Sequence, residues 1–191
     1  MLEKKSQFSK QGYLVLKQAI SQETVEIAKD YFTMQIFNPG HYRKSAACPK
    51  AVDRYGDPLG ESLLIHCRPL LEEHVGLRLH STYSFVRLYR HGSDLRKHTD
   101  RPSCEISATL TIGYKASELW PMMLEVGGET KTIELDRGDL LVFQGNEQPH
   151  WREPFQGDQW IQVFLHYVDA EGNFQEYKYD KRAMLGIDPK T

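Results

Sequence analysis

From residue 79 onward the sequence predicts a succession of short strands, and this feature constrains the fold more than any other. The segment 104–114 carries the clearest signal, because Ile106, Ala108 and Leu110 alternate with polar residues, which is the period of a half-buried strand. The turn Arg137-Gly138-Asp139 separates two of the later segments. Strands are expected at residues 79–90, 104–114, 120–126, 131–135, 140–143 and 160–168. The pattern predicts a closed β-sandwich or barrel.

The residues before 79 predict two amphipathic helices. Ser21 is a good N-cap residue with an acidic residue close behind it, and apolar residues continue at helical spacing as far as Met34. Gly76 is expected to end the second helix. The expected elements are a short strand at residues 12–16, helices at 21–34 and 61–75, and a long surface loop at 41–60.

The chain has 191 residues, which is the size of one ordinary domain. We therefore expect a single domain over residues 1–191, with a helical part at about 1–78, a strand core at about 79–170 and a C-terminal tail at 171–191. Helices followed by a run of strands are typical of α+β proteins. The expected fold class is mainly β (α+β), with the N-terminal helices packed on one side.

Composition limits the partners that the chain can have. The formal net charge is −2, so no basic surface for nucleic acid or an anionic membrane is indicated. No apolar run is long enough to cross a bilayer, and the first residues lack the apolar stretch of a secretory signal. The three cysteines show no CxxC pairing, which argues against a disulfide framework or a zinc site. We expect a cytoplasmic protein without a nucleic-acid or membrane partner.

The motif with the most specific chemistry is His98-Thr99-Asp100, followed at a distance by His150. Side chains two residues apart on a strand point to the same face, so His98 and Asp100 can reach one ion. Two histidines and one carboxylate form the facial ligand set of non-haem Fe(II) oxygenases, which leaves the opposite coordination positions open. His98, Asp100 and His150 are therefore the candidate iron ligands.

The residues around this motif make the assignment more specific. The segment 89–100 reads YRHGSDLRKHTD and resembles the Tyr…Gly…His-X-Asp signature of the 2-oxoglutarate/Fe(II) dioxygenases, in their prolyl 4-hydroxylase-like branch. Residues 106–112 resemble the strand that follows it in that family. Residues 135–143, and then 147–150, are similar to the family's turn, apolar strand and distal histidine. The resemblance extends over about residues 8–170.

The resemblance implies a fold and a reaction. The fold would be a double-stranded β-helix (jelly roll), and the reactants would be Fe(II), 2-oxoglutarate and O₂, with release of succinate and CO₂. Because Asp100 is present, hydroxylation is favoured over halogenation, since halogenases of the family lack that carboxylate. The substrate would be a small molecule or a protein side chain, and a homodimer formed through a sheet edge is compatible with the sequence.

One expected contact to 2-oxoglutarate departs from the family. An Arg or Lys usually opens the strand after the distal histidine and binds the far carboxylate, but the equivalent position here holds the neutral Gln159. Arg152 is the preferred substitute, because it lies two residues after His150 on the same face and its planar fork suits a carboxylate. Tyr89 matches the family tyrosine that meets the co-substrate, and Thr109 could contact it if its face is internal.

Other interpretations stay open at this point. Arg152 could instead be a rim arginine paired with Glu153, and Arg101 and Lys115 are weaker candidates for the anchor. The neutral Gln159 favours a cupin-like metalloenzyme that does not use 2-oxoglutarate. A third class is a metal-binding or non-catalytic jelly-roll module whose site has decayed.

Four further side chains carry chemistry that could contribute to such a site. His166 lies within an apolar strand and is interpreted as a core histidine, whereas His91 is expected to be solvated in a loop. Trp151 could form a wall of the pocket beside the distal histidine. Cys104 has no neighbouring base in the sequence, so we assign it no nucleophilic role.

Overall fold

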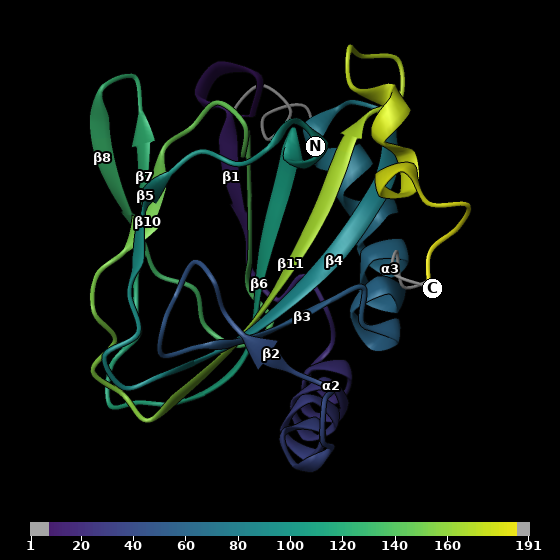
Figure 1. Ribbon diagram of the computed structural model, residues 1–191. Coiled ribbons are helices and arrows are strands. Elements are labelled where there is room, and N and C mark those ends of the chain that lie inside the picture. The colour runs from purple at the N-terminus through teal and green to yellow at the C-terminus, as the bar shows by residue number, and fades with distance from the viewer. Residues whose placement is uncertain (1–7, 187–191) are drawn as a thin grey trace.

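The structure, a computed structural model, describes residues 8–186 as two antiparallel sheets that face one another. The larger sheet has the strand order β1-β9-β6-β11-β4-β3-β2, and the smaller sheet has the order β5-β10-β7-β8. Figure 1 shows the smaller sheet on one side of the larger sheet and α3 on the other. Two packed sheets with helices on one outer face are the architecture that the strand pattern predicts.

Seven strands lie within two residues of their expected bounds, namely β1, β4, β6, β7, β8, β9 and β11, whereas β2, β3, β5 and β10 were not expected as strands. The larger sheet contains β1 (Tyr13–Leu16), β2 (Arg43–Lys44), β3 (Val52–Tyr55), β4 (Leu79–Arg90), β6 (Ile106–Lys115), β9 (Leu140–Phe143) and β11 (Gln159–Asp169). The smaller sheet contains β5 (Leu95–His98), β7 (Met122–Val126), β8 (Glu129–Ile133) and β10 (His150–Arg152). The helices are α2 (Gln22–Met34) and α3 (Pro58–Val75), with short 3₁₀ turns η1 (Gln35–Phe37), η2 (Pro102–Cys104) and η3 (Gln175–Lys181).

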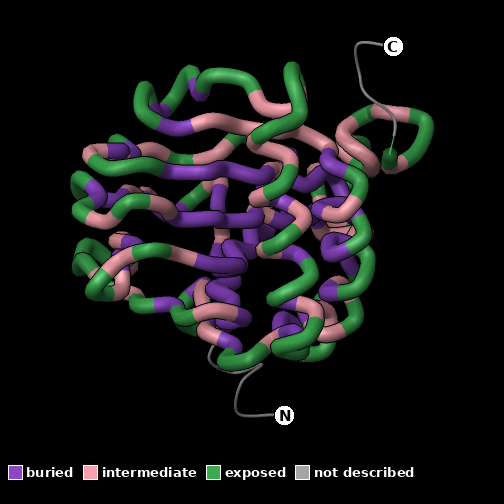
Figure 2. The backbone as a smooth tube through the Cα atoms, turned by 90° about the horizontal axis from the view of Figure 1, so that it is seen from below, coloured by how far each residue is buried: buried purple, intermediate pink, exposed green. Residues whose placement is uncertain are grey.

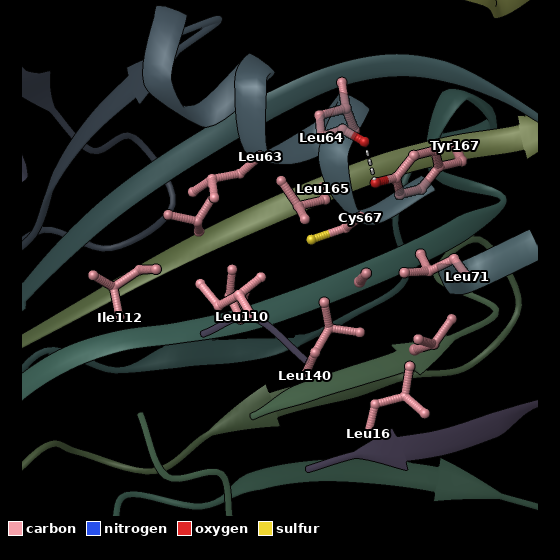
Figure 3. Close-up of a cluster of buried hydrophobic side chains, with 14 of the residues drawn as sticks. Leu16, Leu63, Leu64, Cys67, Leu71, Leu110, Ile112, Leu140, Leu165 and Tyr167 are labelled. Atoms are coloured by element: carbon pink, nitrogen blue, oxygen red, sulfur yellow. Dashed lines mark hydrogen bonds between the residues drawn. The ribbon is translucent and has the colours of Figure 1, made fainter. Parts of the chain in front are cut away.

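Alternation along the central strands separates a helix-covered face from an inner face. On the covered face Leu110, Leu165 and their neighbours form one buried cluster with α2 and α3, and Figure 3 shows these side chains meeting Leu63 and Cys67 of α3. The Tyr167 hydroxyl donates a hydrogen bond to a carbonyl oxygen of α3 at 2.8 Å. In Figure 2 the buried backbone runs through the middle of the strands, and the exposed backbone lies mainly in the loops.

The inner face of the larger sheet is unusually polar for a buried surface. Its buried polar members include Ser107, Thr109 and Thr111 of β6 and Arg87 of β4. Its aromatic members come from the same rows of β4 and β11, which are antiparallel neighbours. Buried polar groups on a sheet face are typical of a ligand cavity rather than of a dry core.

Local capping explains where the helices begin and end. Ser21 caps α2 by accepting a hydrogen bond from the Thr24 N–H at 3.3 Å. Helix α3 begins at Pro58, earlier than expected, because the Asp57 carboxylate accepts hydrogen bonds from two N–H groups of its first turn. Gly76 ends α3 with a φ of 85°, which only glycine adopts without strain.

Two regions differ from their expected structure. Residues 41–60 are not one loop, because β2 and β3 extend the larger sheet and β3 pairs with β4. The tail contains the 3₁₀ turn η3 and lies against β4. Residues 1–7, on which the signal-peptide expectation rested, and 187–191, the end of the tail, lie outside the described residues. Between residues 8 and 186 no helix is long and apolar enough to cross a membrane.

Candidate metal centre

The three candidate iron ligands meet at one end of the space between the sheets. His98 ends β5 and His150 begins β10, and the pairing of these strands places the two residues opposite each other with ring centroids 4.3 Å apart. Asp100 Oδ1 lies 3.7 Å from Nε2 of each histidine. The three donor atoms lie within 4.8 Å of one another. Asp100 itself follows the end of β5 rather than lying on the strand.

Hydrogen bonds fix the orientation of all three donors. Nδ1 of His98 lies 2.8 Å from the Arg96 carbonyl oxygen, and Nδ1 of His150 lies 2.9 Å from the Gln148 carbonyl oxygen. A carbonyl only accepts, so each Nδ1 carries the proton and each Nε2 lone pair faces the centre. Burial lowers the pKa of His150, against the opposing effect of Asp100, which keeps the neutral form that a metal requires.

Asp100 is held from both its backbone and its side chain. Its N–H donates to the Gly145 carbonyl oxygen at 2.8 Å, and its Oδ2 accepts a hydrogen bond from Ser107 Oγ at 2.9 Å. A Cβ at position 145 would lie 2.5 Å from Asp100 Oδ2 and 2.7 Å from the Cys104 carbonyl oxygen. Sequence reasoning missed Gly145, although a glycine between the apolar strand and the distal histidine is a visible signal for close backbone approach.

The three donors open into a cavity of about 180 Å³ between the two sheets. Besides the metal ligands, its lining is mainly aromatic and aliphatic, with one arginine. These residues are Ala47, Tyr83, Phe85, Arg87, Leu95, Phe143, Phe164 and His166. Arg87, which sequence reasoning also missed, is paired with Asp53, with Nε 2.7 Å from Oδ1. A concave, largely apolar space beside a metal face is the form of a small-molecule site.

Arg152 lies deep between the sheets and not at a rim. It is 2% exposed, and the described residues place no carboxylate in contact with it. Its Nη1 donates to the Trp120 carbonyl oxygen, its Nη2 lies 3.3 Å from Gln162 Oε1, and its guanidinium lies over the Trp120 ring at 4.5 Å. The alternative of a rim arginine paired with Glu153 is wrong, since Arg152 is buried and the described residues show no ion pair between the two side chains. Burial lowers the pKa of Arg152 to about 10.

Three buried polar atoms on the inner face of the larger sheet have no hydrogen-bond partner within residues 8–186. They are the Tyr89 hydroxyl, Thr109 Oγ1 and Gln162 Nε2. Gln162 Oε1 is already used, because it accepts from Trp160 Nε1 at 2.7 Å and from Arg152. Each unsatisfied buried donor costs about 1–3 kcal/mol, so their grouping on one inner face indicates a polar ligand.

Solved structures with the same architecture identify the fold. The chain matches no protein-family model and no curated protein sequence. It is similar in structure to a Pseudomonas putida prolyl-4-hydroxylase, with a TM-score of 0.71, 16% identity, and coverage of 88% of this chain and 99% of that one. The chain has the fold of the 2-oxoglutarate-dependent iron oxygenases. The expected double-stranded β-helix is therefore confirmed.

Two further oxygenase structures show the same similarity. The epimerase SnoN of nogalamycin biosynthesis, described as a non-haem α-ketoglutarate-dependent enzyme, has a TM-score of 0.76 and 14% identity, covering 98% of this chain and 91% of that one. HygX from Streptomyces hygroscopicus, solved with nickel and 2-oxoglutarate bound, has a TM-score of 0.71 and 12% identity, covering 90% of this chain and 88% of that one. At such low identity the similarity shows a shared fold, and it does not identify a substrate for this chain.

Within this oxygenase fold, two residues lie elsewhere than expected. Gln159 lies on the opposite face of β11 from Gln162 and lines a separate crevice with Ile36, so the expected contact to a co-substrate is not supported by its position. The neutral residue on the inner face is Gln162, because side chains alternate along β11. Trp151 does not line the metal cavity, and its ring lies 4.7 Å from Lys97 Nζ.

The C-terminal part of the oxygenase fold is tied to the metal centre through Arg101. This residue follows Asp100 and donates two hydrogen bonds to the Asp180 carboxylate, at 2.9 and 2.8 Å, so it is not a free candidate for the anchor. Tyr55 donates to the same carboxylate at 2.6 Å. Tyr179, Asp180 and Lys181 have φ values of 54°, 55° and 63°. Such left-handed residues persist only where surrounding contacts hold them.

We expect Asp180→Asn to weaken metal binding without unfolding the protein. The substitution removes the charge that holds Arg101, and thereby loosens the backbone beside Asp100. The expected loss of Co(II) affinity is about 3- to 10-fold. This is smaller than the loss of about 10- to 100-fold that follows removal of a group hydrogen-bonded directly to a metal ligand. It is measured by titration of the apoprotein with Co(II), followed by visible absorption. The control is Glu171→Gln, a carboxylate that is 75% exposed with only a 3.8 Å ion pair. An unchanged affinity in Asp180→Asn would mean that the pair secures only the tail.

Proposed function

We propose that the protein is a non-haem Fe(II)- and 2-oxoglutarate-dependent oxygenase that hydroxylates a small molecule or a protein side chain. The observation that carries the proposal is the combination of the metal centre with buried Arg152 and the unpaired donors on the inner face of the larger sheet. Three metal donors alone fit many enzymes. Three metal donors together with a buried arginine fit a ligand that chelates the metal and also carries a negative charge.

In this proposal His98, Asp100 and His150 hold Fe(II) on one face and leave the opposite positions open. When bound, the iron and 2-oxoglutarate supply the oxidising power for O₂ activation, with release of succinate and CO₂. The chain itself supplies orientation and exclusion of water. Asp100 presents Oδ1 to the centre, while Ser107 occupies Oδ2, so the carboxylate is held for ligation through one oxygen.

We propose that Arg152 binds the far carboxylate of 2-oxoglutarate, with help from the unpaired donors of Tyr89, Thr109 and Gln162. Burying a guanidinium without a carboxylate has an unfavourable desolvation free energy, and an anion beside it would offset that free energy. Tyr89 lies against Trp120 at 4.8 Å, the same ring that Arg152 covers. Arg87 is the second cation near this end, and its pair with Asp53 already satisfies its charge.

The cupin-like alternative explains the metal centre but leaves the inner donors without a ligand. A metalloenzyme that does not use an acidic co-substrate has no need for an arginine 2% exposed or for three unpaired polar atoms on the inner face. A decayed module is disfavoured by the metal centre, whose three donor atoms all remain supported by hydrogen bonds. The oxygenase proposal accounts for both the metal centre and the buried unpaired donors.

The proposal is tested by anaerobic titration of the Fe(II)-loaded protein with 2-oxoglutarate. A weak visible charge-transfer band is expected as the chelate forms. In Arg152→Met the dissociation constant should rise about 10- to 100-fold, because hydrogen bonds to charged groups contribute about 1.5–3 kcal/mol, while Co(II) affinity stays unchanged. Gln159→Ala is the control and should behave as the wild type.

Three other results would change the proposal in different ways. A band unaffected by Arg152→Met but weakened by Arg87→Met would move the anchor to Arg87. A band unaffected by both substitutions would leave the co-substrate in place and reject both arginines. The absence of a band with iron bound would contradict the use of 2-oxoglutarate and favour the cupin-like enzyme.

We also propose that the protein acts in a reducing compartment, the cytoplasm. Cys48, Cys67 and Cys104 are all buried free thiols, as expected where disulfides do not form. Fe(II) is also more stable to oxidation in such a compartment. Localisation of a tagged full-length chain tests this directly, and a secreted or periplasmic location would contradict it.

A further inference from the structure

His166 is not an isolated core histidine, because hydrogen bonds fix which of its nitrogens carries the proton. Its Nδ1 lies 3.0 Å from Ser107 Oγ. The single hydroxyl proton of Ser107 is directed to acceptors, the Asp100 carboxylate at 2.9 Å and the Cys104 carbonyl oxygen at 3.2 Å. Since neither of these groups can donate in return, His166 must supply the proton to Ser107 through Nδ1–H. Its Nε2 is therefore a hydrogen-bond acceptor.

The acceptor atom is left for a ligand. Nε2 of His166 has no hydrogen bond to any residue between 8 and 186. It is not among the buried polar atoms without a partner in that part of the chain, so it is open to the metal cavity that the ring lines. Burial lowers the pKa of His166 to about 4, against the opposing effect of Asp100. The imidazole is thus neutral at physiological pH, and a neutral acceptor suits a neutral donor rather than an anion.

The surroundings of His166 are flat and apolar. The Tyr83 ring lies 4.6 Å from the imidazole, and the Phe164 ring is parallel to it at 6.5 Å. Phe85 lies beside Phe164 at 6.4 Å. Aromatic walls of this kind favour a ring or another flat apolar group in the ligand.

His166 lines the metal cavity, whereas the proposed co-substrate anchor Arg152 lies farther along the inner face, at Gln162. Its partner in the sheet is Tyr83, whereas Gln162 pairs with Arg87. Four strand positions separate these rows, which is roughly 13 Å at the usual rise per residue. The metal ligand Asp100 is next to the His166 row through Ser107. A group bound at His166 would therefore lie beside the metal on the side away from the 2-oxoglutarate end.

We propose that His166 is a substrate-recognition residue whose Nε2 accepts a hydrogen bond from a hydroxyl or N–H group carried on a neutral, flat ring. The substrate class is then a phenol-like, indole-like or similar donor-bearing ring, either free or as a protein side chain. This inference rests on the proposed function only in assigning the ligand as the substrate.

A second metal ion is a competing use of the same residues. Donor atoms of Asp100, Cys104 and His166 also lie within 4.8 Å of one another. However, the Ser107 hydroxyl already links Asp100 to His166, and Cys104 Sγ lies 3.1 Å from the Tyr83 hydroxyl. An ion there would have to displace both contacts, so a ligand acceptor is the better assignment.

The first test determines the protonation of His166 directly. In Zn(II)-loaded, ¹⁵N-labelled protein, long-range ¹H–¹⁵N spectra should show a protonated Nδ1 and an unprotonated Nε2 for this residue, assigned by its absence in His166→Phe. Ser107→Ala should remove the preference for that tautomer. A protonated Nε2 in the wild type would overturn the proposal, as would binding of two Zn(II) ions with loss of one in Cys104→Ser.

The second test measures recognition without turnover. The probes are phenol and its methyl-capped analogue anisole, titrated into Zn(II)-loaded protein in the presence of 2-oxoglutarate and followed by ligand-observed NMR. Phenol should bind about fivefold more tightly than anisole, the value of one net hydrogen bond of about 1 kcal/mol. In His166→Phe, which keeps an aromatic ring but has no acceptor nitrogen, the two probes should bind equally. The control His74→Phe, at the end of α3, should keep the preference.

Each outcome of the probe experiment decides the inference. Equal binding of the two probes in the wild type, a preference that survives in His166→Phe, or no binding of phenol would each overturn it. Because the readout is probe binding, it is separate from the 2-oxoglutarate titration. A lost preference in His166→Phe together with a failed 2-oxoglutarate titration would reject the proposed function and keep the recognition role.

Discussion

Replacing His150 with alanine is expected to lower Co(II) affinity by more than about 100-fold. Even the loss of a supporting contact to a metal ligand typically costs about 10- to 100-fold, and this substitution removes a ligand. His150 is held by the Gln148 carbonyl oxygen and faces Asp100 Oδ1 at 3.7 Å, so its Nε2 is a donor directed to the centre. The fold should persist, since β10 has backbone partners on both sides.

The measurement is a Co(II) titration of the apoprotein, together with circular dichroism to verify folding. His91→Ala is the matched control, because His91 is exposed and contacts only the Gln156 carbonyl oxygen at 3.2 Å. Its metal affinity should equal that of the wild type. Retention of wild-type Co(II) affinity in His150→Ala would show that the ion binds elsewhere, with the second donor group at Cys104 and His166 as the place to look.

Replacing Gly145 with alanine is expected to damage the metal centre although the residue contributes no ligand atom. The added Cβ would lie 2.5 Å from Asp100 Oδ2 and 2.7 Å from the Cys104 carbonyl oxygen, and closer still to Ser107 Oγ. These are fixed groups, so the carboxylate or its supporting backbone must move. We expect a loss of stability of about 1–3 kcal/mol, as for overpacking, and a fall in Co(II) affinity of at least about 10-fold.

The Gly145 prediction is measured by urea unfolding and by the same Co(II) titration. Gly113→Ala is the control, because its Cβ would meet only the flexible Lys29 side chain, at 3.0 Å or more. That variant should lose little stability and no metal affinity. If Gly145→Ala is destabilised but binds Co(II) as the wild type does, then the strain is relieved away from Asp100 and Gly145 has only a packing role.

The sequence alone determined the elements whose signal is local. The alternation of residues 104–114 predicted β6, the capping residue Ser21 predicted the start of α2, and a glycine marked the end of α3 at Gly76. Each signal depends on a period or a cap that neighbouring residues define. The three candidate metal ligands were also recognisable, because His-X-Asp with a distal histidine is a pattern of residue types and not of distances.

Local signals failed where pairing with distant strands decides the outcome. Residues 41–60 carry polar residues, Gly and Pro, which predict a loop, yet β3 is held in the sheet by its hydrogen bonds to β4. The edge strand is β2, and β3 lies next to it. Neither strand has a buried residue, so their sequences show weak alternation. The C-terminal tail likewise depends on the ion pair between Arg101 and Asp180, which no local pattern reveals.

The surroundings of Arg152 and His166 were decided by tertiary structure. The start of the strand after the distal histidine predicted Gln159 as the neutral position, but Gln159 lies on the outer face of β11 and Gln162 on the inner face. Burial of Arg152 without a carboxylate, and the tautomer of His166, follow from contacts between strands far apart in sequence. The sequence thus determined which chemistry the chain carries, and the packing of the two sheets decided which side chains face it.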